Sequence, residues 1–167
     1  MTDIILVAIG SNLPDAEGRS PLDLCRWAVH RLAAQPGLSL DAVSAWYRTA
    51  PVPASDQPDF INGVVRLSGL LDPLALLGLL HEIEAEVGRI RSVANAARIL
   101  DLDLLAVGAR TISSAGLILP HPRLAERAFV LYPLCDVAPE WRHPTLGRTA
   151  LQLRAALPLQ RIERLLA

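Results

Sequence analysis

Hydrophobic and polar positions follow two different periods along the first part of the chain. A short apolar run at residues 4–9 ends at a glycine, which is typical of a buried strand followed by a turn. Over residues 21–34 the apolar positions recur at helical spacing, and a Gln-Pro-Gly sequence ends the helix. The pattern therefore predicts a strand followed by a helix.

A second strand-rich block and a second helix come next. Residues 40–49 alternate weakly between apolar and polar, and residues 60–67 form an apolar run after a loop rich in proline and aspartate, so we expect two strands. Asp72 and Pro73 stand in the order of a helix N-cap and a first-turn proline. They predict a helix that runs to about Val87.

A predicted strand at residues 98–108 completes the order βαββαβ. This is the order of the ferredoxin-like α+β fold, in which helices pack on one face of an antiparallel sheet. The C-terminal third is predicted to be an extension of short segments with one helix near residues 146–156. Because a chain of 167 residues suits one hydrophobic core, we expect residues 1–167 to form a single domain.

Two carboxylates interrupt the apolar run of the last predicted strand. In a strand, Asp101 and Asp103 share one face, while Leu100, Leu102 and Leu104 share the other. Neighbouring carboxylates repel each other, so a cation is expected between them. Oxygen ligands suit magnesium, and two magnesium ions can bind the oxygens of a phosphate chain. The pattern alone also allows a water-exposed sheet face or pairing with arginines.

Arginine is the residue type available for binding phosphate. All 16 basic residues are arginine, which excludes a lysine Schiff base, a lysine general base and a Walker-type lysine. Arg89, Arg91 and Arg98 cluster just before the two aspartates, and guanidinium groups donate to phosphate oxygens in pairs. His121 stands between two prolines, with two arginines after it. A single histidine in such a position also fits a structural role.

Composition and charge narrow the class of partner. With 51% hydrophobic residues and a net charge of -1, the chain favours small-molecule or protein partners over nucleic acid or anionic membranes. Its first residues do not resemble a secretory signal, and no stretch reaches the roughly 18 apolar residues of a membrane span. We therefore expect a cytoplasmic protein. Cys25 and Cys135 fit buried hydrophobic positions better than a zinc site or a disulfide.

Seven short sequences occur in a fixed order along the chain. They are AIGSN at 8–12, YRTAPV at 47–52, DQPDFIN at 56–62, EAEVGRIR at 84–91, RILDLDLL at 98–105, LPHPR at 119–123 and RAFVLYPL at 127–134. With them, residues 4–140 resemble the 6-hydroxymethyl-7,8-dihydropterin pyrophosphokinases of folate biosynthesis. The resemblance implies a ferredoxin-like core. It also implies a magnesium-dependent transferase that moves diphosphate from ATP to the hydroxymethyl group of the pterin and releases AMP.

The resemblance implies roles for individual residues. Two magnesium ions are expected on Asp101 and Asp103, and Arg89 and Arg98 are expected to join them as catalytic residues. The expected ATP-binding positions are Glu84, Arg91, His121 and Arg127. The expected pterin-binding positions are Thr49, Ala50, Val52, Phe60, Asn62 and Phe129. Phenylalanine is ordinarily a core residue, but the chain has two in all, and the flat pterin is expected to lie between their rings.

Two departures from the family pattern concern the ATP side. The family's aromatic-Gly-Pro-Arg sequence is Asn-Ala-Ala-Arg at residues 95–98, and Gly116 stands where some relatives have arginine. We expect residues 89–97 to be a lid that orders when ATP binds. The expected partners are ATP and the pterin, and the expected state is a monomer. The alternatives are a pterin- or nucleotide-binding member of the family without turnover, and a different magnesium-dependent phosphotransferase.

Overall fold

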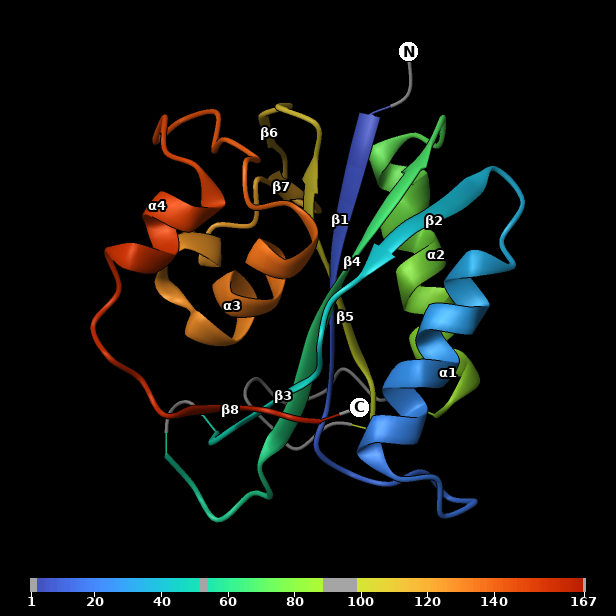
Figure 1. The fold of residues 1–167 in the computed structure, drawn as a ribbon. Helices are drawn as coiled ribbons and strands as arrows, with labels where there is room; N and C mark the ends of the chain where they lie inside the picture. The colour runs from blue at the N-terminus through green and yellow to red at the C-terminus, as the bar shows by residue number, and fades with distance from the viewer. Residues whose placement is uncertain (1–2, 52–53, 89–98, 167) are drawn as a thin grey trace.

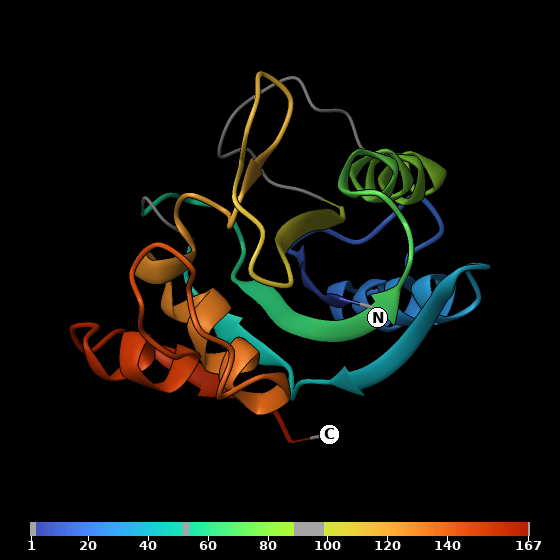
Figure 2. The ribbon, with the colours of Figure 1, turned by 90° about the horizontal axis from the view of Figure 1, so that it is seen from above.

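A curved antiparallel sheet lies between two pairs of helices in the computed structural model (Figures 1 and 2). The structure describes residues 3–51, 54–88 and 99–166. In chain order the elements are β1 (Asp3–Ser11), α1 (Pro21–Ala33), β2 (Leu38–Val43), β3 (Tyr47–Thr49), β4 (Phe60–Gly69), α2 (Pro73–Glu86), β5 (Asp101–Val107), β6 (Ile112–Ser113), β7 (Ile118–Leu119), the 3-10 turn η1 (Leu124–Glu126), α3 (Ala128–Val137), α4 (Ala150–Ala155) and β8 (Ile162–Arg164). The predicted α+β class is confirmed, and the six predicted elements occur in the predicted order, except that one predicted strand is divided into β2 and β3.

The main sheet has the strand order β5-β1-β4-β3-β8, and β2 also pairs with β4. The sequence predicted a single strand at residues 40–49. The structure has two strands there, β2 and β3, so the prediction of one continuous strand was wrong. The chain bends between them, where the Ser44 hydroxyl accepts a hydrogen bond from the Val64 backbone N–H. The ring of Trp46 packs directly over Gly63, where a Cβ would lie 2.4 Å from the ring. These contacts hold the bend against the middle of β4.

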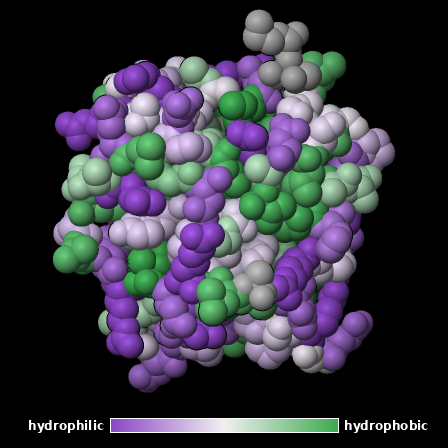
Figure 3. All heavy atoms as spheres, viewed as in Figure 1, coloured by the Kyte–Doolittle hydropathy of each residue, from purple (hydrophilic) through white to green (hydrophobic). Residues whose placement is uncertain are grey.

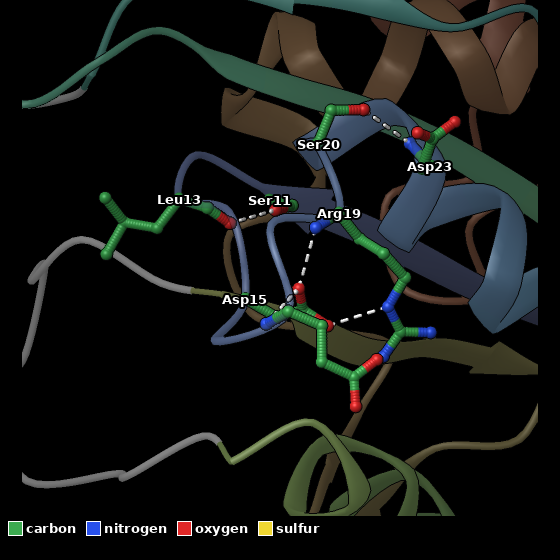
Figure 4. Close-up of polar contacts among 7 residues, drawn as sticks. Ser11, Leu13, Asp15, Arg19, Ser20 and Asp23 are labelled. Carbon is green, nitrogen blue, oxygen red and sulfur yellow. Dashed lines mark hydrogen bonds and ion pairs between the residues drawn. The ribbon is translucent and has the colours of Figure 1, made fainter.

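Helices α1 and α2 cover one face of the sheet and begin at ordinary capping residues. Ser20 caps α1 by accepting from the Asp23 backbone N–H, as drawn in Figure 4. Asp72 caps α2, with Pro73 in the first turn, as the sequence predicts. The core on this face contains these fully buried residues: Ile5, Val7, Ile9, Leu24, Leu32, Leu76, Leu80, Ile83 and Leu102.

Helices α3 and α4 belong to the C-terminal extension and cover the opposite face, while the two core helices lie on one face, as the ferredoxin-like order predicts. Leu131 and Leu134 of α3 form a second core with Leu6 of β1 and Leu105 of β5. The helix α3 was absent from the prediction because its apolar residues run almost continuously and Pro133 lies inside it. The predicted last helix exists, but α4 is shorter than residues 146–156.

Three further features concern the surface, the helix lengths and the cysteines. On the face drawn in Figure 3, hydrophilic and hydrophobic residues are intermixed. None of the helices within the described residues combines the length and the hydrophobicity that crossing a membrane requires. Cys25 and Cys135 are buried free thiols, as expected, and burial raises the pKa of the Cys25 thiol.

Candidate active site

One row of residues across the sheet brings an amide and a carboxylate to the same face. Gly10 of β1 lies opposite Asn62 of β4 on one side and opposite Asp101 of β5 on the other. Directly opposed residues in antiparallel strands project to the same face. Two strand spacings separate the backbones of Asn62 and Asp101, roughly 10 Å. Because Gly10 has no side chain, no side chain of β1 lies between Asn62 and Asp101.

The aspartates of β5 lie as the alternation predicts. Asp101 and Asp103 are half-buried, while Leu102 and Leu104 lie in the core on the α1 and α2 face. Between the two aspartates, the Leu102 backbone N–H donates to the Glu84 carboxylate at 2.7 Å. Glu84 is 1% exposed, so this bond to the strand is buried. Helix α2 therefore holds the strand segment that carries both aspartates.

A cleft of about 290 Å³ opens beside the second aspartate. Asp103, His81, Gly116 and His121 are among the residues that line it. The His121 backbone N–H donates to the Leu105 carbonyl at 2.8 Å, which attaches the histidine to β5. The structure thus places His121 and Asp103 on the same cleft, and the expected contact of His121 with ATP stays a prediction.

The protonation of His121 follows from its contacts. Its Nδ1 accepts a hydrogen bond from the Arg123 backbone N–H at 3.2 Å, so the proton of the neutral ring is on Nε2. Burial lowers the pKa of His121, the Arg127 charge lowers it further, and Asp101 opposes the shift. The ring is thus neutral near pH 7 and retains one N–H donor on Nε2.

The polar residues expected to bind the pterin meet where β3 ends and β4 begins. The Asn62 amide donates to the Thr49 hydroxyl at 2.7 Å, and both side chains are buried. Phe60 pairs with Thr49 across the two strands and is half-buried, and Ala50 follows as an exposed residue. The structure therefore brings Thr49, Phe60 and Asn62 together, two strands away from the aspartates.

The second aromatic residue lies on a different element. Phe129 is half-buried in the first turn of α3 and packs against the core beneath that helix. The guanidinium of Arg127 lies 5.3 Å from the centre of the Phe129 ring. Phe129 therefore has core contacts as well as a partly exposed ring, and its stacking on the pterin stays a prediction.

Asn12 lies directly after β1, at the same end of the sheet as Asn62 and Asp101, and its role was not predicted from the sequence. It is 2% exposed, and its amide donates to the Gln57 side chain and to the Pro58 carbonyl, both at 3.1 Å. These bonds connect the end of β1 to the loop that enters β4 at Phe60. The signal was present in the AIGSN sequence, whose asparagine follows directly after the strand.

The loop after β1 is organised around one carboxylate (Figure 4). Asp15 accepts from the backbone N–H groups of Glu17 and Arg19 and from Arg19 Nε, the last at 2.7 Å. Desolvation would raise the pKa of Asp15, but the hydrogen bonds and charge of Arg19 outweigh it and lower the pKa. The Arg19 guanidinium also lies 5.3 Å from the Trp27 ring. Arg19 thus connects this loop to α1, at the end of the sheet where Gly10 and Asp101 lie.

Several expected site residues fall outside the residues that the structure describes. These are Val52, Arg89, Arg91 and Arg98, together with the expected lid at residues 89–97. Their expected roles stay predictions. Within the described ranges, no group of three or more His, Cys, Asp or Glu side chains is arranged to hold a metal. The donor set of Asp101 and Asp103 fits magnesium, which is commonly bound by one or two carboxylates with substrate phosphates and water as the other ligands.

Comparison with known proteins matches this chain to one family. Residues 6–139 match the family model of 7,8-dihydro-6-hydroxymethylpterin-pyrophosphokinase, HPPK. The 2-amino-4-hydroxy-6-hydroxymethyldihydropteridine pyrophosphokinase of Pseudomonas aeruginosa is 44% identical over 165 residues, which cover 99% of this chain and 98% of that one. The Bacillus subtilis protein of the same name is 39% identical over 137 residues, 82% of this chain and 79% of that one.

The fold is also found in solved structures. Wild-type Plasmodium falciparum HPPK-DHPS, solved with pteroate, has a TM-score of 0.69 and is 15% identical. The match covers 93% of this chain and 42% of that one, which is less than half of the larger protein. At 15% identity it shows a common fold and no more. The family model and the relatives that align over most of their length show that the chain belongs to the 7,8-dihydro-6-hydroxymethylpterin-pyrophosphokinase family.

Proposed function

We propose that this chain is an ATP:6-hydroxymethyl-7,8-dihydropterin diphosphotransferase that uses the Asn62, Gly10 and Asp101 row as its reaction site. In this reaction of folate biosynthesis the pterin hydroxymethyl oxygen forms a bond to the β-phosphorus of ATP. The bond from the β-phosphorus to the oxygen of the α-phosphate breaks, AMP leaves, and the hydroxyl proton is released. The single observation that carries the proposal is the placement of Asn62 and Asp101 on either side of Gly10.

The phosphate side is formed by β5 and the segment that follows it. Asp101 and Asp103 are the residues that would hold two magnesium ions, which neutralise and orient the ATP phosphates when bound. His121 lines the cleft shared with Asp103 and has its ring N–H on Nε2, which we expect to donate to a phosphate oxygen. The positive charge of Arg127 acts on the same histidine. We expect Arg89, Arg91 and Arg98 to add further guanidinium donors.

Glu84 contributes by holding the strand. Its burial and its bond to the Leu102 N–H favour a positioning role over direct contact with ATP. In this role, the bond holds in place the backbone of the segment that carries the two aspartates. The expected contact of Glu84 with ATP is therefore replaced, in this proposal, by an indirect role.

The pterin side is formed by the ends of β3 and β4. Asn62 and Thr49 hydrogen-bond to each other in a buried position, where their remaining donor and acceptor capacity can recognise the polar edge of a pterin. Phe60 supplies an aromatic ring beside them, and we expect Phe129 to supply the second one. Ala50 and Val52 are expected to line the same pocket.

We expect residues 1–167 to act as one domain and as a monomer in the cytoplasm. The two hydrophobic cores support the single domain, because both are built on the same sheet. Size-exclusion chromatography with light scattering checks the monomer.

Analysis of nucleotides after incubation with ATP, magnesium and the pterin tests the activity. The proposal predicts AMP that accumulates only with pterin present and disappears when magnesium is chelated. ADP as the pterin-dependent product would indicate a different phosphotransferase, and binding without nucleotide turnover would indicate a binding protein. Either result would overturn the proposal.

A further inference from the structure

The C-terminal strand lies along the outer edge of the strand that carries Thr49. In Figure 1, β8 runs beside β3 on the side away from β4. Thr49 lies opposite Ile162 in this pairing, and Tyr47 lies opposite Arg164. The Leu165 backbone N–H also donates to the Trp46 carbonyl at 2.8 Å. Strand β3 is thus held on both edges, by β4 and by β8.

β3 needs this second partner because it is short. It has three residues, and so short a strand with one neighbour has few hydrogen bonds to resist local opening. At one end of β3, the Tyr47 hydroxyl donates to the Asp136 carboxylate at 2.7 Å, which connects that end to α3. At the other end, Thr49 contacts Asn62 through its hydroxyl and pairs with Ile162 across to β8.

The attachment of β8 depends on its backbone more than on its side chains. Leu159 and Leu166, on either side of the strand, are 100% and 98% exposed. The ion pair between Arg48 and Glu163 spans 3.5 Å between two exposed side chains, so it contributes little. Leu165 supplies both the hydrogen bond to Trp46 and partial packing against the core.

We propose that β8 is a positioning element for the pterin pocket, which holds Thr49 in the orientation that its hydroxyl needs to accept from Asn62. The proposal rests on the assignment of Thr49 and Asn62 to the pterin above. The strands β4 and β1 separate β3 from β5. The effect of β8 therefore reaches the pterin side of the row and leaves Asp101 and Asp103 unchanged.

Leu165→Pro is the main test, with Leu165→Ala as its matched control. Proline removes the N–H that bonds to Trp46, while alanine keeps that N–H and shortens the same side chain. We expect the proline variant to raise the KM and the Kd for pterin about tenfold, the size of one net hydrogen bond. Leu165→Ala should stay within about twofold of the wild type. In both variants the KM for MgATP should stay within about twofold.

A truncated chain that ends at Gln160 provides a second test if the proline variant does not fold, as judged by circular dichroism. It lacks β8 altogether and should show the same selective loss of pterin affinity, with faster hydrogen exchange at Tyr47–Thr49. Equal changes in the pterin and ATP constants, or no change in either, would overturn the role of β8.

Asn62→Ala in the same assays separates this inference from the assignment on which it rests. If Asn62→Ala leaves pterin affinity unchanged, the assigned pterin pocket is wrong. If Asn62→Ala weakens pterin binding and the β8 variants do not, the pocket stands and the positioning role of β8 is wrong.

Discussion

Asn62 and Asp101 lie on opposite sides of Gly10, on the same face of the sheet and in one row across three strands. The amide belongs to a buried pair with Thr49, and the carboxylate belongs to a strand held by Glu84. The residue between them is glycine, so β1 places no side chain between the amide and the carboxylate. In the proposed function, the pterin lies on the Asn62 side of this row and the phosphates lie on the Asp101 side.

Gly10→Ala should impair pterin binding selectively. A Cβ at position 10 would lie 3.0 Å from Asn62 Oδ1, so the amide has to shift. We expect the KM for pterin to rise about tenfold, which corresponds to ~1.4 kcal/mol and lies within the usual cost of overpacking. Gly78→Ala is the matched control, because a Cβ there meets open space in α2. Steady-state kinetics that show equal pterin constants for the two variants would contradict this prediction.

Glu84→Ala should destabilise the fold because it leaves the buried Leu102 N–H without its acceptor. The expected loss is about 1–3 kcal/mol in the free energy of unfolding, measured by urea denaturation. Glu84→Gln retains a side-chain oxygen and should lose less. Glu82→Ala, at an exposed position of the same helix, should stay within about 0.5 kcal/mol of the wild type. An Ala variant at position 84 as stable as the wild type would show that the bond does not hold β5.

His121 should make the stability of the protein depend on pH. Its pKa in the folded state lies below the ordinary value of 6.5, so below about that pH the unfolded chain binds more protons. The free energy of unfolding should therefore fall as the pH is lowered through 6.5. His121→Gln should flatten this decrease between about pH 7.5 and 5, while the other histidines contribute equally to both profiles. Parallel stability profiles for the two proteins would show that His121 titrates normally.

Local patterns account for most of the elements that could be predicted. The cap of α2 and the alternation around Asp101 and Asp103 are encoded by neighbouring residues, and the structure confirms them. Helix α3 lacks a distinct polar face and contains Pro133, so its pattern does not distinguish it from a buried segment. The split into β2 and β3 depends on packing of Trp46 over Gly63, which no local pattern reports.

The site was harder to predict than the elements because it depends on strand register. Asn62, Gly10 and Asp101 belong to strands far apart in the sequence, and a shift of one residue in any pairing would turn a side chain to the other face. The family resemblance supplied the residue types, and the register supplies their arrangement. The burial of Glu84 and the contacts of Asn12 likewise depend on tertiary packing.

The central claim is that the Asn62 side of the row binds the pterin and the Asp101 side binds the phosphates. Pterin affinity measured in two variants, Asn62→Ala and Asp101→Asn, tests this claim most directly. Isothermal titration with pterin at a saturating concentration of a non-hydrolysable MgATP analogue measures both. We predict that Asn62→Ala weakens pterin binding about tenfold or more, the size of one or two lost hydrogen bonds. Asp101→Asn should retain pterin affinity within about threefold, even though it loses about a thousandfold in turnover. Equal losses of pterin affinity in the two variants, or a larger loss in Asp101→Asn, would contradict the account.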